Sequence, residues 1–239
     1  MTKPYQRWTV LPHGQLSEID DGILTVVGQI HMPLMDLPRR MNIIRLGDSR
    51  LIVWSAIALD DQAMATVEAF GRPAFLIVPS DKHRLDARVW KERYPQMQVV
   101  APSGSRAKVD AVVPVDSTAP DFGDSRVEFV TVPGTGANEA ALLVRTNHGT
   151  TLVLNDLIGN IRHASGLGGR MLRLIGFAGK TPRIPNVVKL VLIKDASALR
   201  AQLLRWAEIK SLKRILVSHG DPIEMNPQHS LRRLAGALA

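Results

Sequence analysis

The sequence RILVSHGDP occupies residues 214–222. Its apolar run is followed by a Ser-His pair, a glycine and a proline, a pattern that predicts a buried strand ending at a loop. A second stretch, TLVLNDL at residues 151–157, has the same form and ends in an Asn-Asp pair. Because α/β proteins tend to place ligands where strands end, His219 and Asp156 are candidates for a shared metal or acid–base site.

The order of the remaining elements predicts an α/β fold. Two close apolar runs separated by the turn GDSR predict a β-hairpin. Alternating strands and helices then predict a parallel βαβ array with right-handed crossovers. The second half predicts an antiparallel meander that is followed by helices and the strand within 214–222. The expected strands are 23–27, 41–46, 51–55, 74–78, 98–101, 112–115, 126–132, 140–145 and 150–154, the expected helices are 62–70, 85–93, 169–175, 195–210 and 228–238, and a polar, proline-rich link is expected from 28 to 38.

The composition is that of an ordinary globular protein. Of 239 residues, 45% are hydrophobic and 22% are charged, and no cysteine is present, which excludes disulfides and thiolate metal ligands. The N-terminus lacks an apolar core of signal-peptide length, and 18 apolar residues nowhere run together, so we expect a cytoplasmic protein without a membrane span. No linker interrupts the pattern. We therefore expect a single domain over residues 1–239, with an irregular segment at 1–22.

The positive charge is concentrated in one segment. Residues 162–214 contain 12 Lys/Arg and two acids, whereas residues 1–161 contain 16 Lys/Arg and 18 acids. This excess is compatible with a merely basic, soluble surface, or with a small anionic substrate or ligand nearby. Nucleic acid is not expected as a partner, because the chain has no recognisable nucleic-acid module and few aromatic residues for base stacking. The sequence carries no signal for an oligomeric state.

In this layout the chain resembles the metallo-β-lactamase-like hydrolase fold, from about residue 22 to the C-terminus. The resemblance is strongest in MNIIRLGDSRLIVWSAIALDD at 41–61, VEFVTVPGTGANEAALLV at 127–144, LVLND at 152–156 and ILVSHGD at 215–221. It implies an α/β fold built as an αββα four-layer sandwich. The chain is most similar to a degenerate bacterial branch of that fold, distinct from the drug-hydrolysing enzymes.

The resemblance also implies a metal site. The family binds one or two metal ions, usually zinc, and its last two ligand positions match Asp156 and His219 in this chain. The loop that reads His-x-His-x-Asp-His in the family reads VPSDKHRLD at residues 78–86 here. It therefore offers Asp81 or His83 as a third ligand, with Asp86 as a weaker one. After the Pro-Gly turn, Thr135 stands where the family has a histidine.

These departures leave two functions open. Three ligands suffice for a catalytic metal, so the chain is expected to be a mononuclear hydrolase of an anionic ester, thioester or phosphoester, with zinc or alternatively manganese or iron. The alternative is a non-catalytic ligand-binding protein that kept the fold, lost the metal and holds Asp156 and His219 by hydrogen bonds. His163 is a weaker replacement ligand. The glycines of GLGG at 166–169 precede a helix and are a weak phosphate-binding signal.

Overall fold

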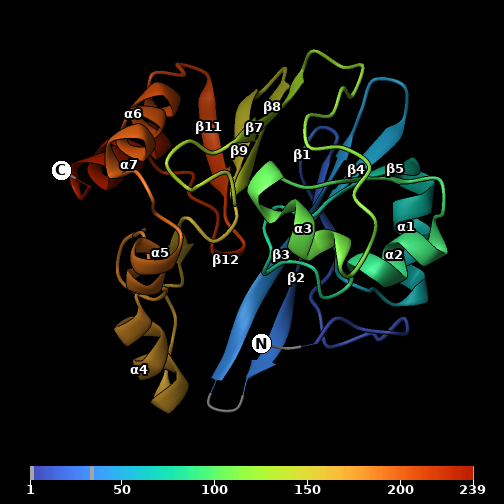
Figure 1. Cartoon of the computed structure of the whole chain (residues 1–239), viewed down its shortest axis with the longest axis horizontal. Coiled ribbons are helices and arrows are strands. Elements are labelled where there is room, and N and C mark those ends of the chain that lie inside the picture. The colour runs from blue at the N-terminus through green and yellow to red at the C-terminus, as the bar shows by residue number, and fades with distance from the viewer. Residues whose placement is uncertain (1–2, 33–34, 239) are drawn as a thin grey trace. The chain divides into compact units, whose positions relative to one another are not determined.

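The computed structural model describes residues 3–32 and 35–238 (Figure 1). The chain divides into two compact units, which are described separately. The first unit is Met1–Gln29 with Arg40–Val127, and the second is Ile30–Arg39 with Glu128–Ala239. Within the described residues, no helix is long and apolar enough to cross a membrane.

The first unit is built on a mixed sheet whose strand order is β1-β2-β3-β4-β5-β6, and two of its strands, β2 and β3, extend beyond the unit. The helices of this unit follow β4, β5 and β6 in the chain. Its elements are β1 (Ser17–Asp20), β2 (Ile23–Met32), β3 (Met35–Arg45), β4 (Arg50–Trp54), α1 (Asp61–Phe70), β5 (Arg72–Ile77), α2 (Ala87–Arg93), β6 (Gln98–Val100), a 3-10 turn (Ser103–Ser105) and α3 (Arg106–Asp110).

The predicted hairpin and βαβ array are both confirmed. β3 and β4 are antiparallel, whereas β4, β5 and β6 are parallel neighbours. Between β4 and β5, α1 begins at Asp60, whose carboxylate accepts a hydrogen bond from Ala63 N at 2.8 Å. The helix ends at Gly71, where a Cβ atom would lie only 2.4 Å from the Ser49 carbonyl oxygen. A capping aspartate and a glycine stop therefore fix the helix ends that the sequence predicts.

The apolar core of the first unit contains Trp90. Its ring is fully buried among aliphatic side chains from the sheet and helices. Trp90 Nε1 donates to the Ile57 carbonyl oxygen at 3.1 Å, so its polar atom is satisfied inside the core.

Asp124 connects the β3–β4 turn to the segment before β7. Its carboxylate accepts hydrogen bonds from Gly47 N at 2.9 Å and from the Arg126 side chain at 2.7 and 3.0 Å. The Arg126 hydrogen bonds, with those from the backbone of Arg126 and Gly47, outweigh burial and hold the pKa of Asp124 well below its usual range. The charged carboxylate therefore stabilises the folded state.

Asp124→Asn is expected to lower the free energy of unfolding by about 1 kcal/mol at pH 7. The folded-state pKa is depressed, so this contribution is present above the unfolded pKa of about 4 and is lost as pH falls through the lower folded value. Urea unfolding at pH 7 and pH 2.5 should show a smaller difference at the lower pH. Asp121→Asn, an exposed aspartate of the same loop, is the control. An equal difference at both pH values would contradict the assignment.

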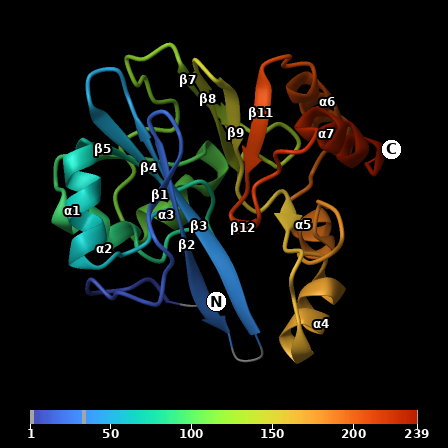
Figure 2. The same ribbon diagram turned by 180° about the vertical axis from the view of Figure 1, so that it is seen from behind.

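The second unit contains a four-stranded sheet of order β11-β9-β8-β7, in which β11 is parallel to β9 and β8 is antiparallel to β9. The two C-terminal helices α6 and α7 pack against each other beside β11 (Figure 2). The elements are β7 (Val127–Thr131), β8 (Ala140–Thr146), β9 (Gly149–Val153), β10 (Gly159–Asn160), α4 (Gly166–Ile175), α5 (Asn186–Val191), α6 (Ala196–Ala207), β11 (Leu212–Leu216), β12 (His219–Gly220) and α7 (Pro227–Gly236).

Several expected elements differ from the structure. Residues 112–115 form turns and coil, because Val115 N donates to the Asp110 carboxylate at 2.6 Å instead of to a neighbouring strand. The expected link at 28–38 is largely extended, since β2 continues to Met32 and β3 begins at Met35; residues 33 and 34 lie outside the described part. The segment expected to be irregular at 1–22 contains β1, and the short helix α5 was not expected.

Candidate metal centre at two strand ends

The two polar strand ends predicted from the sequence lie side by side. β9 and β11 are parallel neighbours, and Leu154 N donates to the Leu216 carbonyl oxygen at 2.8 Å, just beyond their last paired residues. One residue further along, the Ser218 hydroxyl donates to the Asn155 side-chain oxygen in the buried interior. This register places Asp156 and His219 next to each other.

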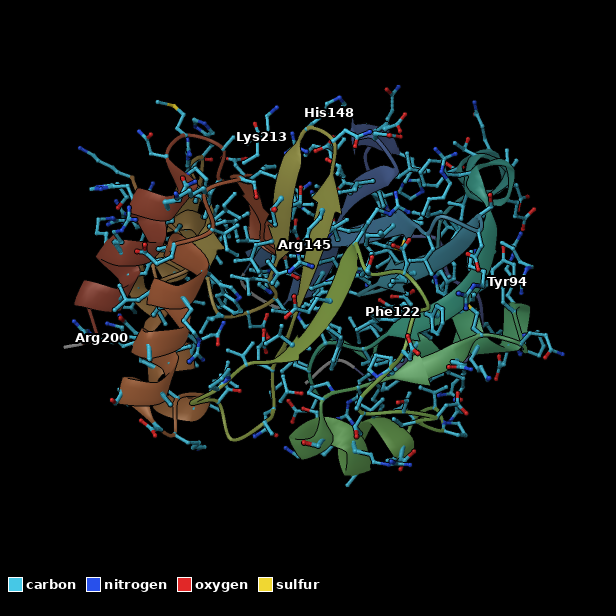
Figure 3. The ribbon with its side chains drawn as sticks, turned by 90° about the horizontal axis from the view of Figure 1, so that it is seen from above. Tyr94, Phe122, Arg145, His148, Arg200 and Lys213 are labelled. Carbon is cyan, nitrogen blue, oxygen red and sulfur yellow. The ribbon has the colours of Figure 1, made fainter. Side chains whose placement is uncertain are left out.

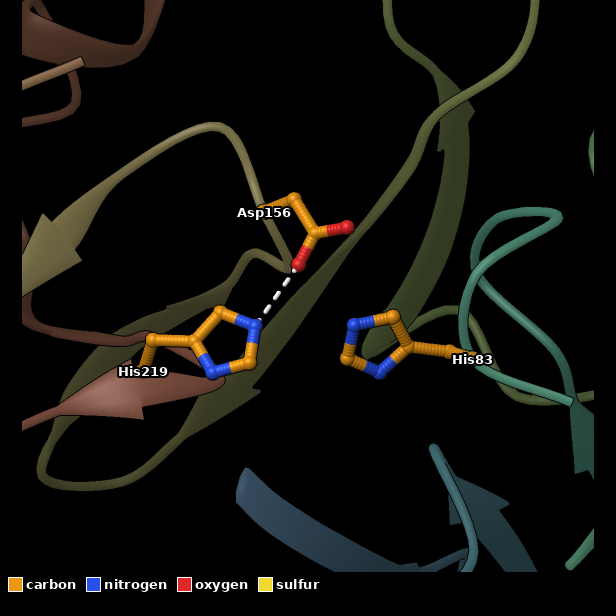
Figure 4. A group of neighbouring side chains, drawn as sticks. All are labelled: His83, Asp156 and His219. Atoms are coloured by element: carbon orange, nitrogen blue, oxygen red, sulfur yellow. Dashed lines mark hydrogen bonds and ion pairs between the residues drawn. The ribbon is translucent and has the colours of Figure 1, made fainter. Parts of the chain in front are cut away.

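His219 is held from several directions within the second unit. Its ring is buried, with 3% of the residue exposed. Nδ1 lies 2.6 Å from the Pro38 carbonyl oxygen, and Nε2 lies 2.9 Å from Asp156 Oδ1 (Figure 4). The ring of Phe177 packs edge-on against the imidazole, with centroids 5.0 Å apart. These contacts fix both the position and the orientation of the imidazole.

The contact between His219 and Asp156 needs a proton or a cation to join the two side chains. A carbonyl oxygen can only accept, so Nδ1 must carry the proton that is shared with Pro38. In a neutral imidazole, Nε2 then has a lone pair, and this lone pair faces a carboxylate oxygen at 2.9 Å. Two such atoms repel each other unless a proton, carried by either group, or a cation joins them. The pair is therefore suited to share a bound cation.

A second acidic side chain supports Asp156. Glu139 is fully buried, and its Oε1 accepts a hydrogen bond from Asp156 N at 2.9 Å. Glu139 is not among the site residues expected from the sequence. The sequence does contain one hint of its role, because Glu139 is an acidic residue directly before the apolar strand β8. Burying a carboxyl group there is unfavourable unless hydrogen bonds satisfy it. Glu139 therefore holds the backbone of Asp156 in place.

The backbone around His219 depends on close packing at a glycine. β10 and β12 pair in parallel, with Gly159 opposite His219 and Asn160 opposite Gly220. Gly220 has φ +115°, and a Cβ atom there would lie 2.3 Å from the Asn160 carbonyl oxygen. The glycine after His219 therefore allows two chain segments to approach closely and holds the histidine at the end of its strand.

In the first unit, the loop after β5 carries His83. The His83 backbone N–H donates to the Ser80 carbonyl oxygen at 3.2 Å and closes a turn. The Ser55 hydroxyl lies 2.8 Å from His83 Nδ1, so β4 and the loop after β5 together orient the ring. The imidazole is half-buried, which fits a side chain that is held in place and still reachable by a ligand.

The carboxylate of Asp81, the other candidate ligand in this loop, forms ion pairs with two lysines. Its carboxylate lies 2.6 Å from Lys108 Nζ and 3.4 Å from Lys82 Nζ. Burial opposes ionisation, but the hydrogen bond from Lys108 and the charges of both lysines outweigh it and lower the pKa of Asp81. These partners give Asp81 a structural role in the first unit.

Two other positions of the resemblance also have structural partners. The buried Asp86 carboxylate accepts a hydrogen bond from Ala58 N at 3.1 Å within the first unit. Thr135, which replaces a family histidine, is fully buried, and its hydroxyl donates to the Val132 carbonyl oxygen at 2.7 Å. His163 is exposed on the segment before α4. Asp86 and Thr135 therefore stabilise local backbone.

Comparison with known proteins defines the fold of the chain. No protein-family model and no curated protein matches the sequence. Solved structures do match. The metallo-β-lactamase FIM-1 from Pseudomonas aeruginosa in its mono-zinc form is 14% identical, with 95% of this chain and 96% of that chain covered and a TM-score of 0.62.

Two further structures agree. TMB-1 is 11% identical with a TM-score of 0.64, covering 93% of this chain and 97% of its own. A metallo-β-lactamase from Hirschia baltica is 10% identical with a TM-score of 0.62, covering 92% and 97%. The chain thus has an α/β fold of the metallo-β-lactamase type, and the fold class expected from the sequence is confirmed.

Proposed function

We propose that the chain is a divalent-metal-dependent hydrolase of anionic esters, thioesters or phosphoesters, with one ion bound at Asp156 and His219. The observation that carries the proposal is the 2.9 Å approach of His219 Nε2 to Asp156 Oδ1 while Nδ1 is engaged by Pro38. An imidazole nitrogen and a carboxylate oxygen are the ligands that zinc, manganese and iron(II) accept. The fold and the donor chemistry support the same site.

We propose His83 as the third ligand beside Asp156 and His219, because the resemblance places a metal ligand in the loop that carries it. A catalytic ion commonly takes three protein ligands and leaves one position open. In the family that the chain resembles, the loop corresponding to the one after β5 carries metal ligands. His83 supplies an imidazole there, whereas the lysine partners of Asp81 oppose a second role for that carboxylate. The reduced ligand set relative to the family implies one ion.

The residues around the pair have separate roles. The Pro38 carbonyl oxygen fixes the Nδ1 proton of His219 and leaves Nε2 for a cation. Glu139 positions Asp156 through its backbone N–H, and Phe177 restricts the rotation of the imidazole. An ion bound there supplies the Lewis-acid chemistry that hydrolysis needs near neutral pH. The role of the protein is to hold these two donors in a fixed orientation.

Hydrolysis assays test the proposal. The full chain, loaded with zinc, manganese or iron(II), is assayed on anionic phosphoesters, thioesters and carboxylic esters, with metal-free protein as the blank. We expect a metal-dependent rate for one class and a loss of about 100-fold or more in kcat/KM for Asp156→Ala. A metal-loaded protein without activity on any of the three classes would overturn the proposal.

His83 and Asp81 are distinguished by a pair of variants. His83→Ala is expected to weaken metal binding by about 100-fold, because it removes a ligand. Asp81→Asn is expected to change metal affinity less than about threefold, because its carboxylate is bonded to lysines. Competition with a chelating dye measures both affinities. A reversed order would assign the third ligand to Asp81.

The second candidate is a ligand-binding protein that has lost the metal. Thr135 favours it, because its buried hydroxyl is bonded to Val132 where the family has an imidazole. In that case a second ring proton, not a metal, would neutralise the His219–Asp156 pair. Wild-type protein that binds no zinc, manganese or iron and still binds an anionic ligand would establish this function.

A further inference from the structure

The second unit contains a cavity that is separate from the His219–Asp156 pair. Its volume is about 440 Å³, within the range of small-molecule sites. The segment after β10, the end of α4 and the loop between α4 and α5 form its wall. The lining residues are Arg162, Arg173, Ala178, Gly179, Lys180 and Arg183.

The cavity has a strong excess of positive charge. Four of its six lining residues are Arg or Lys, and all four are exposed. The Asp221 carboxylate lies 3.9 Å from Arg162 Nε, beyond hydrogen-bond distance. Such a group of like charges is unfavourable by itself and is relieved by a bound anion. A cation does not match the charge of this lining.

The backbone positions Arg183 for such an anion. A Cβ atom at Gly179 would lie 2.9 Å from Arg183 Cζ and 3.0 Å from its Nε, so the guanidinium rests directly against the glycine. Arg183 and Gly159 exchange backbone hydrogen bonds of 3.1 and 2.9 Å, and Gly179 N donates to the Ile161 carbonyl oxygen at 3.0 Å. Backbone hydrogen bonds at Gly179 and at Arg183 therefore hold this loop against β10 and the residue that follows it.

We infer that this cavity is a binding site for a phosphate or phosphate-monoester group. Guanidinium groups bind the oxygens of a phosphate in pairs, and a dianion needs more than one positive partner. The three arginines and Lys180 supply both requirements, and the close packing at Gly179 reduces the entropic cost of holding Arg183. The inference needs no metal and is independent of hydrolytic activity.

Titration of inorganic phosphate into the metal-free full chain tests the inference, with calorimetry at low ionic strength as the readout. We expect saturable binding with a Kd of about 1 mM or tighter. Arg183→Gln should weaken binding about tenfold or more, and Gly179→Ala should weaken it as well by displacing the guanidinium. Both changes lie at the surface, so folding is expected to be retained.

The control variants are Arg200→Gln and Lys213→Gln. Each removes one exposed positive charge of the same unit, from α6 and from β11, outside the cavity (Figure 3). Both should change the phosphate Kd less than about twofold if the cavity is the site. Equal weakening by Arg200→Gln and Arg183→Gln, or no saturable binding to wild type, would overturn the inference.

Two probes distinguish the sources of the phosphate group. Glycerol 3-phosphate represents soluble monoesters, and vesicles containing phosphatidic acid represent a lipid headgroup. Binding of either probe that is lost in Arg183→Gln supports the site and assigns its source. Vesicle binding that is unchanged in Arg183→Gln, without binding of the soluble probe, would contradict it.

Discussion

His219→Ala is expected to abolish stoichiometric binding of a divalent ion. The variant removes Nε2, which lies 2.9 Å from Asp156 Oδ1, and leaves a carboxylate without its imidazole partner. Loss of a ligand from a three-ligand site lowers affinity by about two to three orders of magnitude, so the metal content should fall from one ion per chain to about 0.1 or less. Elemental analysis after metal loading and desalting measures the content.

Two variants make this result specific. His148→Ala removes an exposed histidine of the β8–β9 turn and should leave the metal content unchanged (Figure 3). Asp156→Asn retains the shape of the side chain but removes its charge, and it should lower the metal content with little change in near-UV circular dichroism. Full metal content in His219→Ala, with the fold intact, would remove His219 from the ligand set.

Gly134→Ala is expected to cause the largest loss of stability. Gly134 has φ +81°, and a Cβ atom there would lie 2.3 Å from the Asp195 carbonyl oxygen and 2.7 Å from Leu199 N. Its own carbonyl oxygen accepts hydrogen bonds from Lys194 N and Asp195 N at the start of α6. The substitution would force α6 away from the turn, and we expect a loss of about 3–5 kcal/mol in the free energy of unfolding.

Gly166→Ala is the matched control, because Gly166 also has a positive φ, +67°, but no atom lies within 4 Å of its Cβ position. It should cost only about 1–2 kcal/mol, the conformational penalty without the clash. Urea unfolding of both variants gives the comparison. Similar losses in both would show that the contact between Gly134 and the start of α6 is not a source of stability.

The sequence predicted the elements with clear local signals. The helix expected at 62–70 is present as α1, and Asp60 and Gly71 cap its two ends. The matched strands that end in Asn155-Asp156 and Ser218-His219 predicted a shared edge, and these residues do lie side by side. Alternating apolar runs and turn residues therefore determined the fold class, because burial and backbone sterics act locally at those positions.

Other features depended on contacts between distant parts of the chain. Pro38 and His219 are 181 residues apart in the sequence. A hydrogen bond from an imidazole to a backbone carbonyl oxygen cannot be predicted from composition or spacing. Asp81 was a candidate ligand because its loop stands where the resemblance places metal ligands, whereas its bond to Lys108, 27 residues away, is visible only in the structure. Val113 and Val115 of the apolar run at 112–115 are buried, although the run does not form a strand.

We propose above all that the Asp156–His219 pair binds one divalent ion. Elemental analysis of the purified wild-type chain, after loading with zinc, manganese or iron(II) and removal of unbound metal, tests it most directly. The proposed site predicts about one ion per chain. Less than about 0.1 ion per chain with all three metals would contradict it and would leave the pair as a proton-linked contact in a ligand-binding protein.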